Sequence, residues 1–157
     1  MVGLIKMGVV GVNREDIDKA TQRIYSVEDA PVRVRQTLAV AAEEGVPDFT
    51  VNARVDTLVH GGALPKVIQR GGAHLAAGAT TVFVWGGSKR GVSRAEVEHM
   101  TKEFGGRLNV SMRLAPGNLT AHALADIGVA RISIGPALQF KAMETFKTEA
   151  EKLLAPG

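Results

Sequence analysis

The chain has 157 residues, of which 45% are hydrophobic and 22% charged, and its formal net charge is +3. That length suits one domain with a core, and the scattered basic residues with few aromatic ones between them argue against a nucleic-acid surface. The chain contains no cysteine, which excludes disulfides and thiolate chemistry, and no apolar run approaches the roughly 20 residues that span a bilayer, so we expect a cytoplasmic protein.

Strands and helices are predicted to alternate along the chain. Each strand is a short apolar or alternating run, and each helix begins at a capping residue or proline and ends near glycine. The predicted strands cover residues 8–13, 48–56, 81–85, 107–113 and 130–134. The predicted helices cover about 26–44, 65–77, 93–104, 118–126 and 137–154. A polar loop is expected up to Tyr25, and another loop over residues 86–91.

This alternation predicts a single α/β domain over residues 1–157, built on a parallel sheet. Two architectures fit it. Five strands could form a complete flavodoxin-like sheet, or they could be about the last five β/α units of a (β/α)8 barrel whose first part is missing. The strand count favours the first. The abrupt start and the polar alternation of two strands favour the second, because barrel strands point one face inward.

The stretch from Asp48 to Asp56 has a strictly alternating pattern. One face is apolar, and the other carries Asn52, Arg54 and Asp56 in a row. A strand between two helices usually has both faces covered, and an unpaired buried charge is costly. The row is therefore either an internal Arg–Asp pair or a ligand-facing surface, and we favour the latter.

Further polar side chains stand where other predicted strands end, and in either architecture ligands collect at those carboxyl ends. This set comprises Glu15, Asp16, Asn52, Arg54, Asp56, Trp85, Asn109, Ser111, Arg113 and Ser133. Arginine binds carboxylate or phosphate through its fork of N–H groups, and Glu15 or Asp16 suits Mg²⁺. We therefore predict a site for an anionic substrate. The glycine-rich run 86–91 lacks phosphate-loop spacing.

Several segments resemble the isocitrate lyase/phosphoenolpyruvate mutase family, especially its mutase-like members of the phosphoenolpyruvate phosphonomutase and carboxyvinyl-carboxyphosphonate phosphorylmutase type. They are GVVGVNRED (8–16), DFTVNARVD (48–56), AAGATTVFV (76–84), RLNV (107–110) and LADIGVARISIGPAL (124–138). The resemblance implies a (β/α)8 barrel and Mg²⁺. It also implies formation or cleavage of a C–C or P–C bond in a small 2-oxo or 2-hydroxy acid or phosphonate, through an enolate.

The resemblance also suggests roles for individual residues. Glu15 would contact Mg²⁺, and Arg54 would bind a substrate carboxylate or phosphonate. Asn52 would act beside Arg54 in catalysis, and Asn109 and Ser111 would orient substrate oxygens.

The chain departs from the family pattern in ways that limit these expectations. The family's first strands, with the aspartates that carry most of the metal binding, would precede residue 1. The loop 16–25 lacks the catalytic cysteine of the lyases, and Trp85 stands where lyases often have an acidic residue. Two hypotheses follow: a lyase or phosphonomutase, or a truncated, non-catalytic remnant that binds small anions and self-associates. The resemblance further suggests a homo-oligomer with the terminal segment 137–157 exchanged between subunits.

Overall fold

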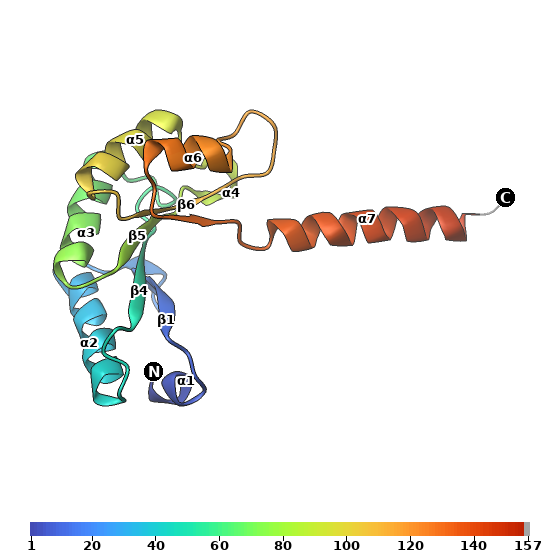
Figure 1. Cartoon of the computed structure of the whole chain (residues 1–157). Coiled ribbons are helices and arrows are strands. Elements are labelled where there is room, and N and C mark those ends of the chain that lie inside the picture. Colours follow the sequence, from blue (N-terminus) through green and yellow to red (C-terminus); the bar gives the residue numbers. More distant parts are fainter. Residues whose placement is uncertain (156–157) are drawn as a thin grey trace.

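The computed structural model describes residues 1–155 (Figure 1). The elements are, in chain order, α1 (Val2–Lys6), β1 (Gly11–Glu15), β2 (Ile17–Asp18), β3 (Arg23–Ile24), α2 (Asp29–Glu43), β4 (Thr50–Val55), α3 (Leu64–Ala76), β5 (Thr81–Val84), α4 (Gly87–Arg90), α5 (Arg94–Glu103), β6 (Leu108–Ser111), α6 (Ala121–Ile127), β7 (Arg131–Ser133) and α7 (Ala137–Leu154).

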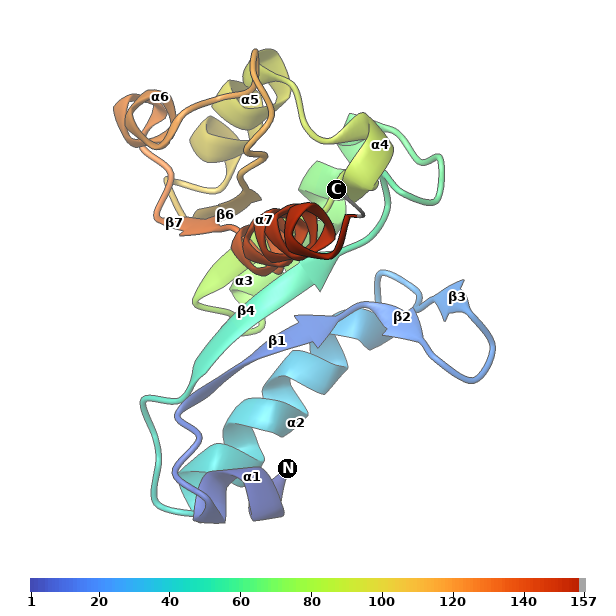
Figure 2. The same ribbon diagram turned by 90° about the vertical axis from the view of Figure 1, so that its right-hand side faces the viewer.

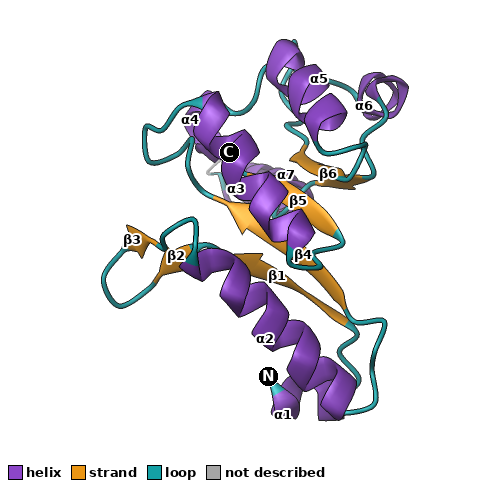
Figure 3. Cartoon of the chain, turned by 90° about the vertical axis from the view of Figure 1, so that its left-hand side faces the viewer, coloured by secondary structure: helices purple, strands orange, loops and turns teal. Residues whose placement is uncertain are grey.

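Five strands form one parallel sheet in the order β1-β4-β5-β6-β7. Each connection leads from one strand to its next neighbour, always in the same direction across the sheet. Connections of the same handedness therefore place all of their helices on the same face of the sheet. Figure 3 shows α2, α3 and α5 together on that face. A flavodoxin-like sheet would reverse direction after its first strands and carry helices on both faces. The partial-barrel prediction is therefore confirmed, and the flavodoxin-like alternative is wrong.

The apolar side chains of the strands pack against this helix layer. Val51 and Ala53 of β4 are fully buried with Val34 of α2, while Val55 belongs to a second cluster with β5, β6, α3 and α5. Because side chains alternate along a strand, the residues between them face the opposite side of the sheet.

That opposite face is polar. The strand register sets Asn13 beside Asn52 and Glu15 beside Arg54. Figure 2 views the molecule from the side toward which α7 projects, with the sheet behind it. The structure thus presents a helix-covered apolar face and a polar face, the arrangement that one part of a barrel wall has.

Helix α7 extends away from the rest of the molecule (Figure 1). The predicted bounds of this helix are confirmed, yet none of its described side chains is buried. Its large apolar residues are all exposed: Leu138, Phe140, Met143, Phe146, Leu153 and Leu154.

Three local predictions need correction. The expected loop before Tyr25 contains the β2–β3 hairpin, and the expected loop 86–91 contains the short helix α4. Helix α6 is capped by Thr120, whose hydroxyl accepts the Ala123 N–H at 3.1 Å, and not by Asn118. Among the described residues, no helix combines the length and the apolar character needed to cross a bilayer.

Candidate functional site

A hydrogen-bonded polar layer crosses the first three strands of the sheet. The Asn52 side chain donates to Asn13 Oδ1 at 2.5 Å and accepts from the Thr81 hydroxyl at 2.7 Å. Asn52 is 1% exposed, and its bond to Thr81 is buried, whereas its bond to Asn13 reaches an exposed side chain. The predicted site residue Asn52 therefore links three neighbouring strands by side-chain hydrogen bonds, and its role in catalysis stays a prediction.

Arg54 lies one step nearer the carboxyl edge and is held from three sides. Its Nε donates to Asp56 Oδ1 at 2.8 Å, and its Nη1 donates to Glu15 Oε1 at 3.0 Å. The guanidinium carbon lies 4.2 Å from the centroid of the Trp85 ring, a cation–π contact. The Arg54 side chain is still 20% exposed. The internal Arg–Asp pair thus exists, and N–H groups of the guanidinium remain for a ligand.

Two carboxylates surround this one guanidinium. Burial raises the pKa of Asp56, while Arg54 opposes that rise. The second oxygen of Asp56, Oδ2, is buried without a hydrogen-bond partner among the described residues. With both acids ionised, Glu15, Arg54 and Asp56 together carry one negative charge.

Asn109 and Ser111 lie on β6, apart from the β1–β4 group. Asn109 accepts a hydrogen bond from Ser133 at 3.0 Å, and its Nδ2 is buried and unpartnered within the described chain. Ser111 lines an open hollow of about 370 Å³ together with Trp85 and Arg113. Because Trp85 also stacks on Arg54, it connects the two groups of predicted residues.

Sequence reasoning missed the partners of Asn52. Asn13 and Thr81 stand at the same level on the two neighbouring strands. The alternation of Asn13 and Glu15 along β1 was the available signal. Which residues of β4 they meet depends on the strand register, which the sequence of one strand does not reveal.

Comparison with known proteins gives the family. The profile of the phosphoenolpyruvate phosphomutase family matches residues 2–154. The chain belongs to this family.

Two solved structures from Burkholderia cenocepacia J2315 resemble this family member closely. One, provisionally assigned as a phosphonomutase, is 31% identical with a TM-score of 0.84 over 96% of this chain and 62% of its own. The other, provisionally assigned as a lyase/mutase, is 30% identical with a TM-score of 0.81 over 95% and 53%. The chain therefore spans less than two thirds of their length.

A phosphonopyruvate hydrolase solved in complex with oxalate and Mg²⁺ shares the fold at 22% identity, with a TM-score of 0.74 over 94% of this chain and 51% of its own. Among curated protein sequences, none matches this chain significantly.

This member of the phosphoenolpyruvate phosphomutase family does not hold a complete Mg²⁺ site in its described residues. No group of three or more acidic or histidine side chains converges there. Glu15 bonds to Arg54 and lies 3.9 Å from Lys19. Asp16 is buried, accepting from Arg70 Nε at 2.9 Å and from the Asp56 N–H at 3.0 Å. Of the two predicted acids, only Glu15 retains an exposed carboxylate edge.

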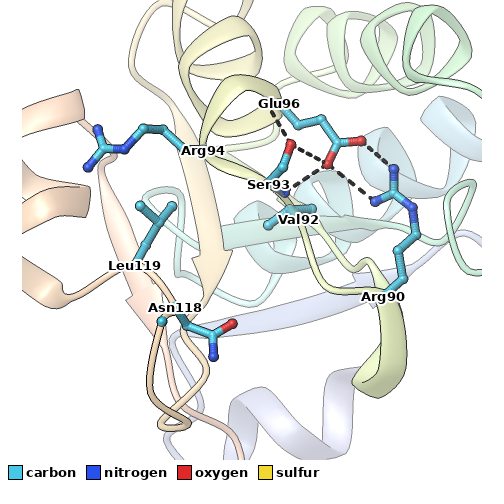
Figure 4. Close-up of a pocket in the computed structure, with 8 residues that line it drawn as sticks. Arg90, Val92, Ser93, Arg94, Glu96, Asn118 and Leu119 are labelled. Carbon is cyan, nitrogen blue, oxygen red and sulfur yellow. Dashed lines mark hydrogen bonds and ion pairs between the residues drawn. The ribbon is translucent and has the colours of Figure 1, made fainter.

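The glycine-rich segment after β5 does not form a phosphate cradle in this family member either. Arg90, at the end of α4, forms an ion pair with Glu96, which also closes the capping box of α5 with Ser93 (Figure 4). Arg94, across the same hollow of about 700 Å³, pairs with Glu98 at 3.2 Å. Both cations are thus already neutralised by carboxylates.

Proposed function

We propose that the polar face of the sheet binds the anionic end of a small 2-oxo acid, 2-hydroxy acid or phosphonate in an enzyme that forms or cleaves a C–C or P–C bond. Arg54 carries this proposal. Glu15, Asp56 and Trp85 fix its guanidinium at the carboxyl edge of the sheet, and part of it stays exposed. A fixed, partly exposed guanidinium is well suited to a carboxylate or phosphonate.

The other predicted residues supply hydrogen-bonding groups on the same sheet. Bond making or breaking next to a carbonyl places negative charge on an enolate oxygen, and preorganised donors stabilise that charge. The unpartnered Nδ2 of Asn109 and the hydroxyl of Ser111 are such donors, and Asn52 keeps one amide hydrogen beyond its bond to Asn13. These roles support an enolate mechanism in which the protein binds and orients the substrate oxygens.

The charges around Arg54 determine whether a divalent cation would strengthen the binding of an anionic substrate. A dianion approaching Glu15, Arg54 and Asp56 meets a net negative group, so we expect a divalent cation to strengthen binding. The phosphonopyruvate hydrolase neighbour, solved with oxalate and Mg²⁺, supports this expectation. The described residues provide one exposed carboxylate, Glu15, so its contact with Mg²⁺ stays a prediction and further ligands must come from water or another segment.

Calorimetric titration with oxalate, with and without Mg²⁺, tests the proposal. We expect oxalate to bind in an Mg²⁺-dependent manner and to change the fluorescence emission of Trp85, the chain's one tryptophan. Arg54→Lys should bind oxalate at least about tenfold more weakly, because lysine keeps the positive charge but loses the paired N–H donors of the guanidinium. Arg107→Ala is the control. Arg107 is exposed just before β6 begins, so it lies at the amino edge of the sheet, whereas Arg54 lies at the carboxyl edge. Absence of Mg²⁺-linked heat in the wild type, or equal affinity of Arg54→Lys, would refute the proposal.

A second candidate is a non-catalytic remnant that binds small anions and self-associates. The exposed apolar residues of α7 favour it, as do the outer strands β1 and β7, which have no further strand beside them in residues 1–155. A well-folded monomer in solution would contradict this candidate. Cytoplasmic location, homo-oligomerisation and exchange of the segment 137–157 also stay predictions.

A further inference from the structure

Arg14 is an unexpected residue on the helix-facing side of the sheet. It pairs in register with Ala53, which packs in a core cluster with Val34 of α2. Its chain neighbours Asn13 and Glu15 reach their partners on the polar face. Arg14 is therefore half-buried on the helix-facing side of the sheet, where its side chain lines a hollow at the outer strand β1, and a partly buried charge needs a partner.

The described residues give Arg14 no such partner. Burial and then the charge of Arg33 lower its pKa, and Tyr25 is the neighbour that acts in the opposite direction. Its Nε is buried without a hydrogen bond, as is the Nη1 of Arg33. The Arg33 guanidinium carbon lies 4.0 Å from the Tyr25 ring centroid, which is a cation–π contact. Arg14 and Arg33 thus line one hollow without a hydrogen-bonded carboxylate among the described residues, while the charge of Asp18 interacts with Arg33 through space.

Two carboxylates, Glu15 and Asp18, line the same hollow as three cations, so the hollow has a net charge of +1, and both carboxylates make other bonds. Glu15 bonds to Arg54, and Asp18 accepts from the Ala20 N–H at 3.0 Å and from the Thr21 hydroxyl at 2.9 Å to close the β2–β3 turn. Lys19 adds a third cation to the same hollow, whose volume is about 460 Å³. Ligand sites in proteins commonly measure about 300–1,000 Å³, so a small anion fits.

We propose that this hollow, between β1, the β2–β3 hairpin and α2, binds a small, doubly charged oxyanion of the phosphate class, held by Arg14 and Arg33. Guanidinium forks match the oxygens of such anions, and a dianion compensates both charges at once. Arg14 and Arg54 lie on opposite faces of the sheet, so different arginines serve the two sites, which meet at Glu15.

Titration of the full chain with inorganic phosphate at constant ionic strength tests the site, by calorimetry and by NMR of the arginine Nε–Hε groups. We expect saturable binding, shifts at Arg14 and Arg33, and at least about tenfold weaker binding for Arg33→Gln, which removes a charge-assisted contact. Arg35→Gln is the matched control on the same helix, because Arg35 is exposed and its loss changes the net charge equally. Arg54→Lys should bind phosphate normally.

Several outcomes would overturn the proposal. These are absence of saturable phosphate binding in the wild type, equal weakening by Arg35→Gln and Arg33→Gln, or acetate binding as tightly as phosphate. Arg14→Leu provides a second variant, since leucine suits a helix-facing strand position beside the core residue Ala53. It should fold, and it should lose both phosphate binding and the rise in melting temperature that phosphate gives the wild type.

Discussion

His74 is a buried polar residue to which the proposed function assigns no role. It lies near the end of α3, 2% exposed, and neither ring nitrogen has a hydrogen-bond partner in the described chain. Burial lowers the pKa of His74 to about 4, with Asp16 raising it and Arg70 lowering it further. The imidazole is therefore neutral in the folded protein near pH 7.

This depressed pKa predicts a pH dependence of stability. Between about pH 6.5 and 4 the unfolded chain binds a proton that folded His74 resists, so the free energy of unfolding falls as the pH falls through this window. Urea unfolding at pH 7 and 4.5 should show a loss on the order of 2 kcal/mol greater in the wild type than in His74→Gln. The raised pKa of Asp56 acts in both proteins and cancels in the comparison. Parallel pH curves for the two proteins would contradict the assignment.

At the scale of residues, the sequence allowed some contacts to be predicted and not others. The Arg54–Asp56 pair follows from alternation, because residues two apart on a strand share a face. The Asn52 bonds to Asn13 and Thr81 join residues 39 and 29 positions apart, and the strand register sets them. The shared hollow of Arg14 and Arg33 could not be predicted, because it depends on how α2 packs beside β1 and the β2–β3 hairpin.

At the scale of elements, prediction succeeded where periodicity was long and failed where side chains close a turn locally. Helices α5 and α7 were both found from sequence. The β2–β3 hairpin was missed because its strands have two residues each and Asp18 side-chain bonds define its turn. The close approach of α3 to the end of α5 could not be predicted either, since it depends on Phe104 lying opposite Gly71.

Gly71 and Gly72 of α3 give opposite predictions for the same substitution. A Cβ at Gly71 would lie 2.3 Å from Cζ of Phe104, whereas a Cβ at Gly72 meets nothing within 4 Å. We expect Gly71→Ala to destabilise the fold by about 1–3 kcal/mol through overpacking. Gly72→Ala should stabilise it by about 0.5–1 kcal/mol, because alanine favours a helix interior. Urea denaturation of both variants measures the difference, and equal effects would show that the helices do not approach as closely as described.

At the scale of the whole molecule, the fold is a sheet with unequal faces. Helices cover one face, and the other carries the Asn52 layer and the Arg54 cluster, with α7 projecting on that side (Figure 2). The neighbours from B. cenocepacia match nearly all of this chain but only 62% and 53% of their own lengths. The family resemblance could be predicted from sequence motifs, while the sequential strand order, which decided between barrel and flavodoxin-like sheet, required the structure.

Helix α7 carries the last prediction, because it determines how the molecule associates. Met143, Phe146, Ala150 and Leu153 follow one another at spacings of three and four residues, which forms an apolar stripe along one side of the helix. An 18-residue helix with this stripe and no buried residue gains stability by packing against another surface, and a second copy of the chain offers an equivalent stripe.

We therefore expect light scattering to give a mass above that of one chain, and Phe146→Glu to shift the protein toward the monomer by placing a charge in the contact. Thr148→Glu is the control, since Thr148 is exposed on the side of the helix opposite the stripe and the substitution adds the same charge. A wild type that is monomeric at all concentrations, with an unchanged melting temperature in Phe146→Glu, would show that α7 needs no partner. If Phe146→Glu becomes monomeric but still binds oxalate with Mg²⁺, association and the Arg54 site are independent, and the polar face of one chain is sufficient for binding.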